Sequence, residues 1–172
     1  MKVLVAFYSR TGTTKKVAER IAEKLGADSD ATGHGVSVEE IKDTVDRSGA
    51  RGYLLAGRDS VRRKLTKLEN LQFNPAEYDL AIIGTPIWAW NMSAPIRTYV
   101  SQQKNNFKKA AFFCTMGGSG GKRAFSEMEK IIELKPITTL ALTTKEVVGG
   151  NFSEKVEKFL RVIREEGLST KG

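Results

Sequence analysis

The first 26 residues join a short buried strand to a polar turn and an amphipathic helix, and this order constrains the fold more than any other feature. Apart from Lys2, residues 2–8 are apolar at both odd and even positions, which is typical of a parallel strand covered on both faces. After the polar residues 9–14, apolar side chains recur at every fourth position up to Gly26, and they are Val17, Ile21 and Leu25. This spacing predicts a helix that packs on the strand, so the unit predicts an α/β domain.

The same order of strand, loop and helix recurs later in the chain. Further buried strands are predicted over residues 79–84, 110–114 and 137–142. Helices are predicted over residues 94–103, 122–133 and 153–164. Because parallel strands are joined by right-handed crossovers, these units predict a single three-layer α/β/α domain over residues 1–172. Its five-stranded parallel sheet is expected to have the order 2-1-3-4-5, which is one of the two common orders of doubly wound sheets.

The region between the first helix and residue 77 is harder to interpret. A weak strand is expected near residues 28–33. A helix is expected over residues 52–68, where the apolar residues have helical spacing. Residues 28–52 are the stretch for which the sequence predicts secondary structure least clearly.

Composition argues against several functional classes. The chain has 172 residues, with 28 Lys and Arg against 20 Asp and Glu, and its net charge is +8. The single cysteine, Cys114, cannot form an intramolecular disulfide, and the single histidine, His34, argues against a multi-histidine metal centre. We therefore expect no metal site and a cytoplasmic location. The longest apolar runs, residues 3–8 and 110–114, are too short to cross a membrane or to form a signal peptide.

The loop between the first strand and the first helix is rich in hydroxyl groups. Its hydroxyls can donate to an anion, Gly12 allows a close turn, and the free N–H groups of the helix start point to the same place. The Gly-Lys-Ser/Thr ending of a nucleoside-triphosphate loop does not occur in it. A phosphate site is favoured, and ordinary helix capping is the alternative. The candidate binding residues are Ser9, Arg10, Thr11, Gly12, Thr13 and Thr14.

Two tryptophans lie in the stretch bracketed by Pro86 and Pro95. Prolines at both ends predict that Trp88 and Trp90 belong to a strand-to-helix loop rather than to a core stripe. A planar aromatic ligand that stacks on such a ring gains about 0.5–1.5 kcal/mol beyond simple burial. Packing of the rings beneath the loop is the alternative. The candidate binding residues are Thr85, Pro86, Ile87, Trp88, Ala89, Trp90 and Asn91.

A third loop, residues 115–122, contains four glycines in five positions. Such a run suits backbone amides that approach a flat ligand, and a plain flexible loop is the alternative. Its candidate residues are Thr115, Met116, Gly117, Gly118, Ser119 and Gly120. Ligands of open parallel sheets bind beyond the carboxyl ends of the strands, so the three loops are expected to meet there. A loop for a phosphate, aromatic rings for a planar ligand and backbone donors together predict a mononucleotide site.

These motifs resemble the flavodoxin family over nearly the whole chain. Residues 9–14 are similar to that family's phosphate motif, Trp88 stands where many members place a ring over the flavin, and residues 115–121 correspond to the third flavin loop. The resemblance implies a flavodoxin-like fold that binds one FMN without a covalent bond, held by the candidate residues of the three loops. No residue is assigned a catalytic role, because the chemistry would belong to the flavin.

Two neighbouring groups within this resemblance imply different functions. Thr85 and Pro86 followed by residues 91–94 are similar to the flavin loop of NAD(P)H:quinone oxidoreductases related to the Trp-repressor-binding protein. Residues 47–68 resemble a helical segment of stand-alone flavodoxin-like proteins. An electron carrier between redox partners is one implied function, and an NAD(P)H-dependent quinone or flavin reductase is the other. Two departures from the family are Ala89, where many members have glycine, and the lack of a tyrosine in the third loop.

The positive charge has an uneven distribution. Between Asp79 and Glu127 the chain has no acidic residue, and this interval contains the second and third loops. Its basic residues are Arg97, Lys104, Lys108, Lys109, Lys122 and Arg123. A second basic cluster within residues 58–67 is interpreted as the solvated face of a helix.

The charge near the loops predicts docking to redox proteins with acidic surfaces, or binding of NAD(P)H. Nucleic acid is disfavoured as a partner, because the basic residues are not interleaved with aromatic ones and no binding motif is present. The sequence leaves the oligomeric state open, including a dimer.

Overall fold

A parallel sheet forms the centre of the computed structural model, which describes residues 1–26, 35–45 and 49–168. Its strands are β1 (Val3–Phe7), β2 (Val36–Glu40), β3 (Leu80–Trp88), β5 (Ala110–Met116) and β6 (Thr139–Thr143). They lie in the order β2-β1-β3-β5-β6, and the two-residue β4 (Asn91–Met92) pairs antiparallel with the end of β3. With β4 set aside, the predicted order 2-1-3-4-5 is confirmed.

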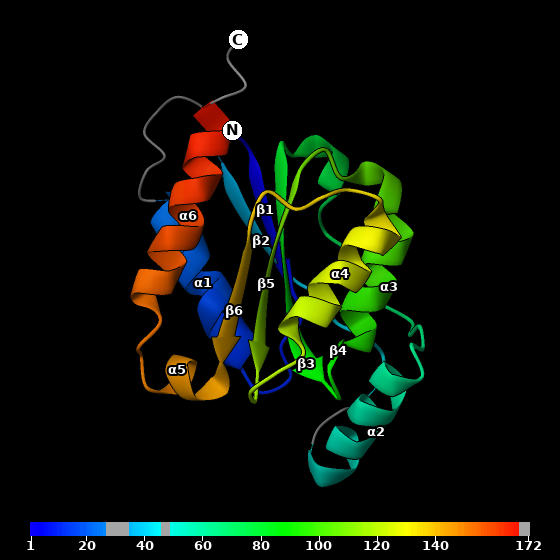
Figure 1. Ribbon diagram of the computed structural model, residues 1–172. Coiled ribbons are helices and arrows are strands. Elements are labelled where there is room, and N and C mark those ends of the chain that lie inside the picture. The colour runs from blue at the N-terminus through cyan, green and yellow to red at the C-terminus, as the bar shows by residue number, and fades with distance from the viewer. Residues whose placement is uncertain (27–34, 46–48, 169–172) are drawn as a thin grey trace.

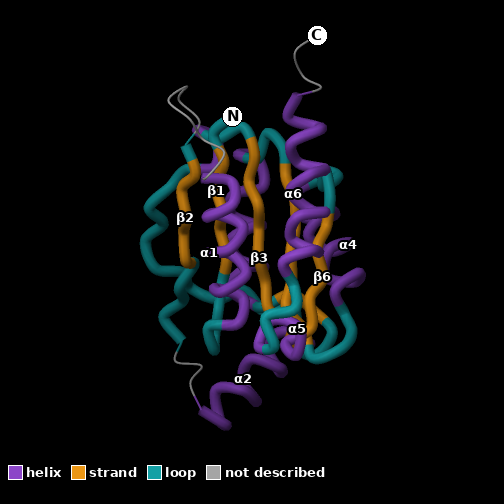
Figure 2. Tube along the Cα trace, turned by 90° about the vertical axis from the view of Figure 1, so that its left-hand side faces the viewer, coloured by secondary structure: helices purple, strands orange, loops and turns teal. Residues whose placement is uncertain are grey.

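Helices cover both faces of this sheet (Figures 1 and 2). One face carries α1 (Thr13–Gly26) and α6 (Ser153–Leu168), together with the short α5 (Thr144–Val148). The other carries α3 (Ala94–Gln103) and α4 (Gly121–Ile132). Two short 3₁₀ turns, η1 (Pro75–Glu77) and η2 (Lys104–Asn106), precede β3 and β5. The three-layer α/β/α architecture is therefore confirmed.

Alternate residues of each strand fill two separate cores. Val5 and Phe113 face α1 and α6, whereas Ala6 and Phe112 belong to the core beneath α3 and α4. Burial on both sides explains why the strands are apolar at odd and even positions. Gly84 in β3 is required by this packing, because a Cβ atom there would lie 2.0 Å from the ring of Phe113 on the neighbouring strand.

β3 runs past its predicted end. Pro86 is aligned with Thr115 in the last pair of the β3–β5 ladder, so its missing N–H falls where the pairing with β5 ends. The strand continues to Trp88 and turns back into β4. The prediction that Pro86 ends the regular strand and leaves Trp88 in a loop is therefore wrong.

The second strand differs from its prediction because it has almost no apolar pattern. Residues 28–33, where a weak strand was expected, lie outside the described residues, and the strand that pairs with β1 is β2. β2 is an edge strand whose buried side chain is the charged Glu39, while Val38 is 41% exposed. Hydrophobic periodicity could not find a strand of this composition.

The helix predicted over residues 52–68 is correct only in its first part. α2 (Gly49–Val61) ends at Val61, and Arg63 has a φ of 52°, which is incompatible with a right-handed helix. Beyond it the chain runs beside the sheet, where Leu68 forms an antiparallel bridge with Asp43. Backbone pairing next to the sheet edge thus overrides the helical spacing of the side chains.

α2 lies beyond the carboxyl ends of the strands rather than over a face of the sheet (Figure 1). It packs against β3, β4 and α3. Its inward residues are small or paired, and they are Gly52, Ala56 and Asp59. These positions are about one helical turn apart, so they form a single narrow face.

Candidate functional site

Three loops meet at the carboxyl edge of the sheet because they follow adjacent strands. β1 pairs with β3, and β3 pairs with β5, all in parallel. The loop before α1, the β3–β4 turn and the loop before α4 therefore emerge at one edge, as the sequence predicted. Figure 1 shows this edge at the bottom of the molecule, next to α2.

The first loop organises the start of α1. Ser9 Oγ accepts hydrogen bonds from the backbone N–H groups of Gly12 (3.1 Å) and Lys15 (3.2 Å). Gly12 has a φ of 86°, a conformation that favours glycine in this turn. The hydroxyl oxygens of Thr11 and Thr13 lie 3.5 Å apart, and Thr11 is exposed. Hydroxyl donors at a helix N-terminus without an acid in its first turn suit an anion such as a phosphate.

The second loop is a two-residue hairpin turn with an unusual backbone. Its central residues, Ala89 and Trp90, have φ values of 46° and 62°, a conformation that usually requires Gly, Asn or Asp. Ala89, a departure from the family because alanine tolerates positive φ less well than glycine, takes this conformation because the short β3–β4 ladder imposes the turn. Non-glycine residues in this region cost of order 1 kcal/mol each, and such costs are often found at binding sites.

The two tryptophans have different environments. Trp88 is only 7% exposed, and its ring meets that of Tyr8 edge to face, with centroids 5.4 Å apart. Trp90 is 63% exposed at the tip of the hairpin. Trp88 was expected to present its ring to a ligand, but it belongs to the core instead. Trp90 offers the accessible aromatic surface, while Tyr8, which is not among the binding residues predicted from the sequence, packs against Trp88 from the end of β1.

Side-chain hydrogen bonds connect the third loop to the other two. The hydroxyl oxygens of Thr14 and Thr115 are 2.8 Å apart and buried. Trp90 Nε1 donates to Ser119 Oγ at 3.1 Å. At Gly120 a Cβ atom would lie 2.8 Å from the Cα of Trp90, so the backbones of the second and third loops approach closely there. The three loops are therefore coupled parts of one site.

A buried polar cluster lies behind the hairpin turn. The backbone N–H of Ser93 donates to Thr85 Oγ1 at 3.0 Å, and Asn91 Nδ2 donates to the carbonyl oxygen of Ala89 at 3.3 Å. Asn91 is 3% exposed, and its Oδ1 has no hydrogen-bond partner among the residues that the structure describes. A buried acceptor of this kind normally has a partner, so Asn91 fits a ligand that carries N–H or O–H donors.

The basic residues of the acid-free interval do not surround the site as the sequence suggested. Arg97 is 6% exposed and its guanidinium pairs with Glu127 at 2.6 Å, just beyond the interval. Lys108 and Lys109 precede β5, at the opposite edge of the sheet from the loops, and Lys104 lies in η2 before them. The interval contributes only Lys122 and Arg123, in the first turn of α4, to the edge with the three loops. Each strand carries the chain from one edge of the sheet to the other, so residues close in sequence can lie at opposite edges. A charge count along the chain therefore could not show which basic residues lie near the loops.

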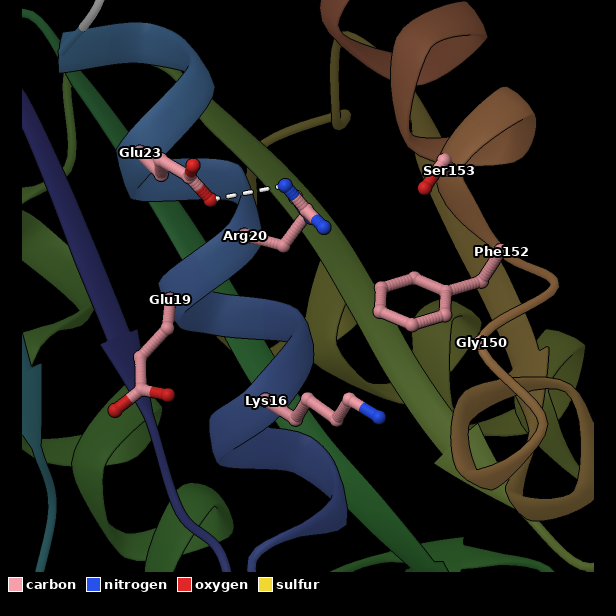
Figure 3. A pocket seen from close by; sticks show the side chains of 7 residues that line it. All are labelled: Lys16, Glu19, Arg20, Glu23, Gly150, Phe152 and Ser153. Carbon is pink, nitrogen blue, oxygen red and sulfur yellow. Dashed lines mark hydrogen bonds and ion pairs between the residues drawn. The ribbon is translucent and has the colours of Figure 1, made fainter.

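A separate pocket lies between α1 and the start of α6 (Figure 3). It has a volume of about 300 Å³. Lys16 Nζ donates to the carbonyl oxygen of Val147 at 3.2 Å, and Arg20 pairs with Glu23 at 3.0 Å. Phe152 forms one wall, and the Lys16 ammonium is 6.0 Å from the centroid of its ring. These contacts connect α1 with the α5–α6 region, away from the hairpin and the glycine loop.

Within the described ranges, no group of three or more His, Cys, Asp or Glu residues could hold a metal ion. No described helix is long and apolar enough to cross a membrane. Cys114 is fully buried, and burial raises the pKa of its thiol to about 12. A thiol in this state is a packing residue rather than a nucleophile.

Comparison with known proteins assigns the family. The sequence profile of the flavodoxins matches residues 2–147, which is most of the chain. The chain belongs to the flavodoxin family. A flavoprotein from Lactobacillus acidophilus NCFM, solved in complex with FMN, is 26% identical, with a TM-score of 0.64, and the match covers 86% of this chain and 97% of that one.

Two further solved structures place the fold of this flavodoxin among its relatives. A putative flavoprotein from Bacteroides uniformis ATCC 8492 is 25% identical, with a TM-score of 0.70 over 93% of this chain and 97% of that one. A flavodoxin from the domain Archaea is 16% identical, with a TM-score of 0.55 over 94% and 93% of the two chains. The latter likeness concerns the fold alone.

Proposed function

We propose that this flavodoxin binds one FMN without a covalent bond and carries electrons between redox partners. The observation that carries the proposal is the coupling of a hydroxyl-rich helix start, an aromatic hairpin tip and a glycine loop at one edge of the sheet. The Lactobacillus relative that is solved with FMN supports the same ligand. When bound, the flavin supplies the electron-transfer chemistry, and the protein supplies orientation and electrostatics.

Each loop has a separate part in holding the FMN. Residues 9–14 hold the phosphate through hydroxyl groups and backbone N–H groups at the start of α1. Residues 85–91 flank the isoalloxazine ring and the ribityl chain, with the Trp90 ring and Asn91 Oδ1 as the available contacts. Residues 115–120 contact the other side of the ring system through backbone groups. The residues proposed to hold FMN are those of the three loops named from the sequence, with Trp90 in the aromatic role first given to Trp88.

The phosphate assignment is tested by comparing FMN with riboflavin. We expect FMN to bind at least about tenfold more tightly than riboflavin, because charge-assisted hydrogen bonds to phosphate are among the strongest in proteins. The double substitution Thr11→Val and Thr13→Val should reduce this preference without weakening the binding of riboflavin. Thr139→Val, at the opposite edge of the sheet, is the matched control. Equal binding of both flavins to the unmodified protein, measured by fluorescence quenching, would contradict the assignment.

A reductase that uses NAD(P)H is the second candidate, and one observation favours it. Gly117 and Gly118 are exposed, and Cβ atoms at either position would meet open space, so these two positions of the third loop carry no side chain that could cover a bound ring. A second planar reactant can then approach the flavin from that side. Anaerobic mixing with NADPH separates the candidates: rapid bleaching of the visible flavin band supports a reductase, and a carrier bleaches only through a partner protein.

The proposed partners of the carrier are redox proteins with acidic docking surfaces, since the chain has a net charge of +8. A cytoplasmic location is part of the same proposal. It is consistent with a single thiol that is buried, and it is tested by fractionating cells and blotting for the protein.

A further inference from the structure

A large positive charge lies on α2 and the residues that follow it. Residues 49–67 contain six Arg and Lys residues and one Asp, so this segment has a net charge of +5 against +8 for the whole chain. The sequence suggested only a solvated helix face. α2, however, lies at the edge of the sheet with the three loops, next to the β3–β4 hairpin (Figure 1). The excess charge is therefore close to the proposed flavin site.

The outward side of α2 alternates apolar and cationic side chains. Leu54 is 73% exposed and Val61 is 61% exposed. Arg51 and Arg58 lie on the same side at helical spacing, and Arg62 follows directly after the helix. We name these five residues the α2 face. Large exposed apolar side chains beside arginines are typical of interaction surfaces, where Arg is enriched.

An ion-pair cluster joins the end of α2 to the neighbouring helices. Arg63, just after the helix, pairs through its guanidinium with Glu127 Oε1 at 2.8 Å, and Arg97 occupies Glu127 Oε2 at 2.6 Å. Glu127 lies on α4 and Arg97 on α3. The segment after α2 is thus joined to both helices on this face of the sheet, which presents the α2 face in a defined orientation.

We propose that the α2 face is the docking surface for an acidic redox protein that exchanges electrons with the bound flavin. The inference rests on the proposed function. A partner with carboxylates around an apolar centre complements the alternation of Leu54 and Val61 with arginines, and long-range attraction steers its approach.

Charge and spacing disfavour the other occupants. A second copy related by a two-fold axis would bring the same positive face against itself, which is repulsive. A helix that binds to a membrane surface has its apolar side chains on one side and its charged side chains on the other. On α2, Arg58 lies between Leu54 and Val61 on the same side, so the two classes are interleaved rather than separated.

The test uses an acidic plant-type [2Fe–2S] ferredoxin as the probe. Its affinity for the full chain is measured by calorimetry at low ionic strength, together with the rate of electron transfer from the reduced ferredoxin to the flavin. We expect the double substitution Arg51→Glu and Arg62→Glu to weaken binding at least about tenfold and to slow the transfer by a similar factor. The affinity of the unmodified chain should fall steeply as salt is added.

The matched control is Lys104→Glu with Lys108→Glu, which changes the net charge equally at the other edge of the sheet. It should keep the affinity within about threefold, because distant charges are screened. Equal weakening by both double variants, or no binding of ferredoxin to the unmodified chain, would overturn the proposal. So would the retention of ferredoxin binding in the Arg51→Glu/Arg62→Glu variant together with a loss of its binding to phosphatidylserine vesicles.

FMN content separates this inference from the function on which it rests. Both double variants must bind FMN as the unmodified chain does, because none of the four exchanged residues lies in the three loops. If the unmodified chain binds no FMN, the proposed function fails. The calorimetric comparison of the two double variants still decides whether the α2 face binds the acidic protein.

Discussion

Burial decides which reactive residues of this flavodoxin are available for chemistry. Cys114 is the only thiol of the chain, and it lies fully buried on β5. Desolvation favours its neutral form and raises its pKa to about 12. At neutral pH almost no thiolate is present, so this residue cannot contribute redox or nucleophilic chemistry.

We predict that Cys114 in the native protein reacts with a thiol reagent such as DTNB about a thousandfold more slowly than in the unfolded chain. Absorbance of the released thiolate at mildly alkaline pH measures both rates. The same sample in guanidinium chloride is the control, and it should release one equivalent per chain. Stoichiometric labelling of the native protein at the unfolded rate would contradict the prediction.

Glu39 is a second buried group, and it anchors the segment that follows α2. It is 5% exposed on β2, and its Oε1 accepts a hydrogen bond from the backbone N–H of Gln72 at 2.5 Å. Burial raises the pKa of this carboxyl, and hydrogen bonds from the backbone of Gln72 and Phe73 oppose the rise in part. The folded state therefore holds the proton more tightly than the unfolded chain does.

The sign of the pH dependence follows from that raised pKa. The contribution of Glu39 to stability is fully present below its ordinary pKa, and it is lost as the pH rises through the raised value. We predict that Glu39→Gln is at least as stable as the unmodified protein at neutral pH. The difference between them should vanish in mild acid. Glu39→Ala should lose about 1–3 kcal/mol, since it leaves the Gln72 N–H without its acceptor. Urea unfolding at several pH values measures the free energy of unfolding of all three proteins.

At the scale of elements, the β3–β4 hairpin shows how a short ladder imposes a strained turn. Pairing of Trp88 with Asn91 leaves only Ala89 and Trp90 to reverse the chain, and both take positive φ. The strain lies next to the proposed flavin site, where it holds the Trp90 ring at the surface.

We predict that Ala89→Gly raises the free energy of unfolding by up to about 1 kcal/mol, because glycine adopts positive φ without a steric penalty. The same exchange at Ala22, inside α1, should lower stability by about 1 kcal/mol. Urea unfolding of the two variants compares them directly. A loss at Ala89 as large as the loss at Ala22 would show that the turn is not strained.

At the scale of the whole molecule, one carboxylate joins three parts of the fold. Glu127 on α4 pairs with the buried Arg97 on α3 and with the exposed Arg63 after α2. The side chain of Arg97 is 7% exposed and that of Arg63 is 60% exposed. The two ion pairs therefore differ in energy although they share one acceptor.

We predict that Glu127→Gln destabilises the protein by about 3 kcal/mol or more, because it leaves the buried Arg97 charge without a carboxylate. Arg63→Ala should cost only about 0–1 kcal/mol of global stability. Hydrogen exchange should nevertheless show faster opening of α2 in the Arg63→Ala variant. Equal global losses for the two variants in urea unfolding would contradict this account.

Local patterns were sufficient for much of this fold. Residues 3–7 and 110–114 are buried on both faces, and such strands are apolar at every position, so the sequence alone was sufficient to predict them. The helix over residues 94–103 was predicted with its observed bounds, since it begins with a proline in its first turn. The hydroxyl loop and the glycine loop were found for the same reason, because turn chemistry is local.

The sequence by itself determined the sheet, its order and the three loops at its carboxyl edge. Only the tertiary structure decided that Trp90 rather than Trp88 is exposed and that α2 stops at Val61. It also decided that most basic residues of the acid-free interval lie away from the site. Each of these depends on contacts between residues far apart in the chain: Trp88 on Tyr8, the segment after α2 on β2 and its flanks, and Arg97 on Glu127. Periodicity and turn preferences describe a residue and its chain neighbours, whereas exposure and charge pairing are set by packing between elements.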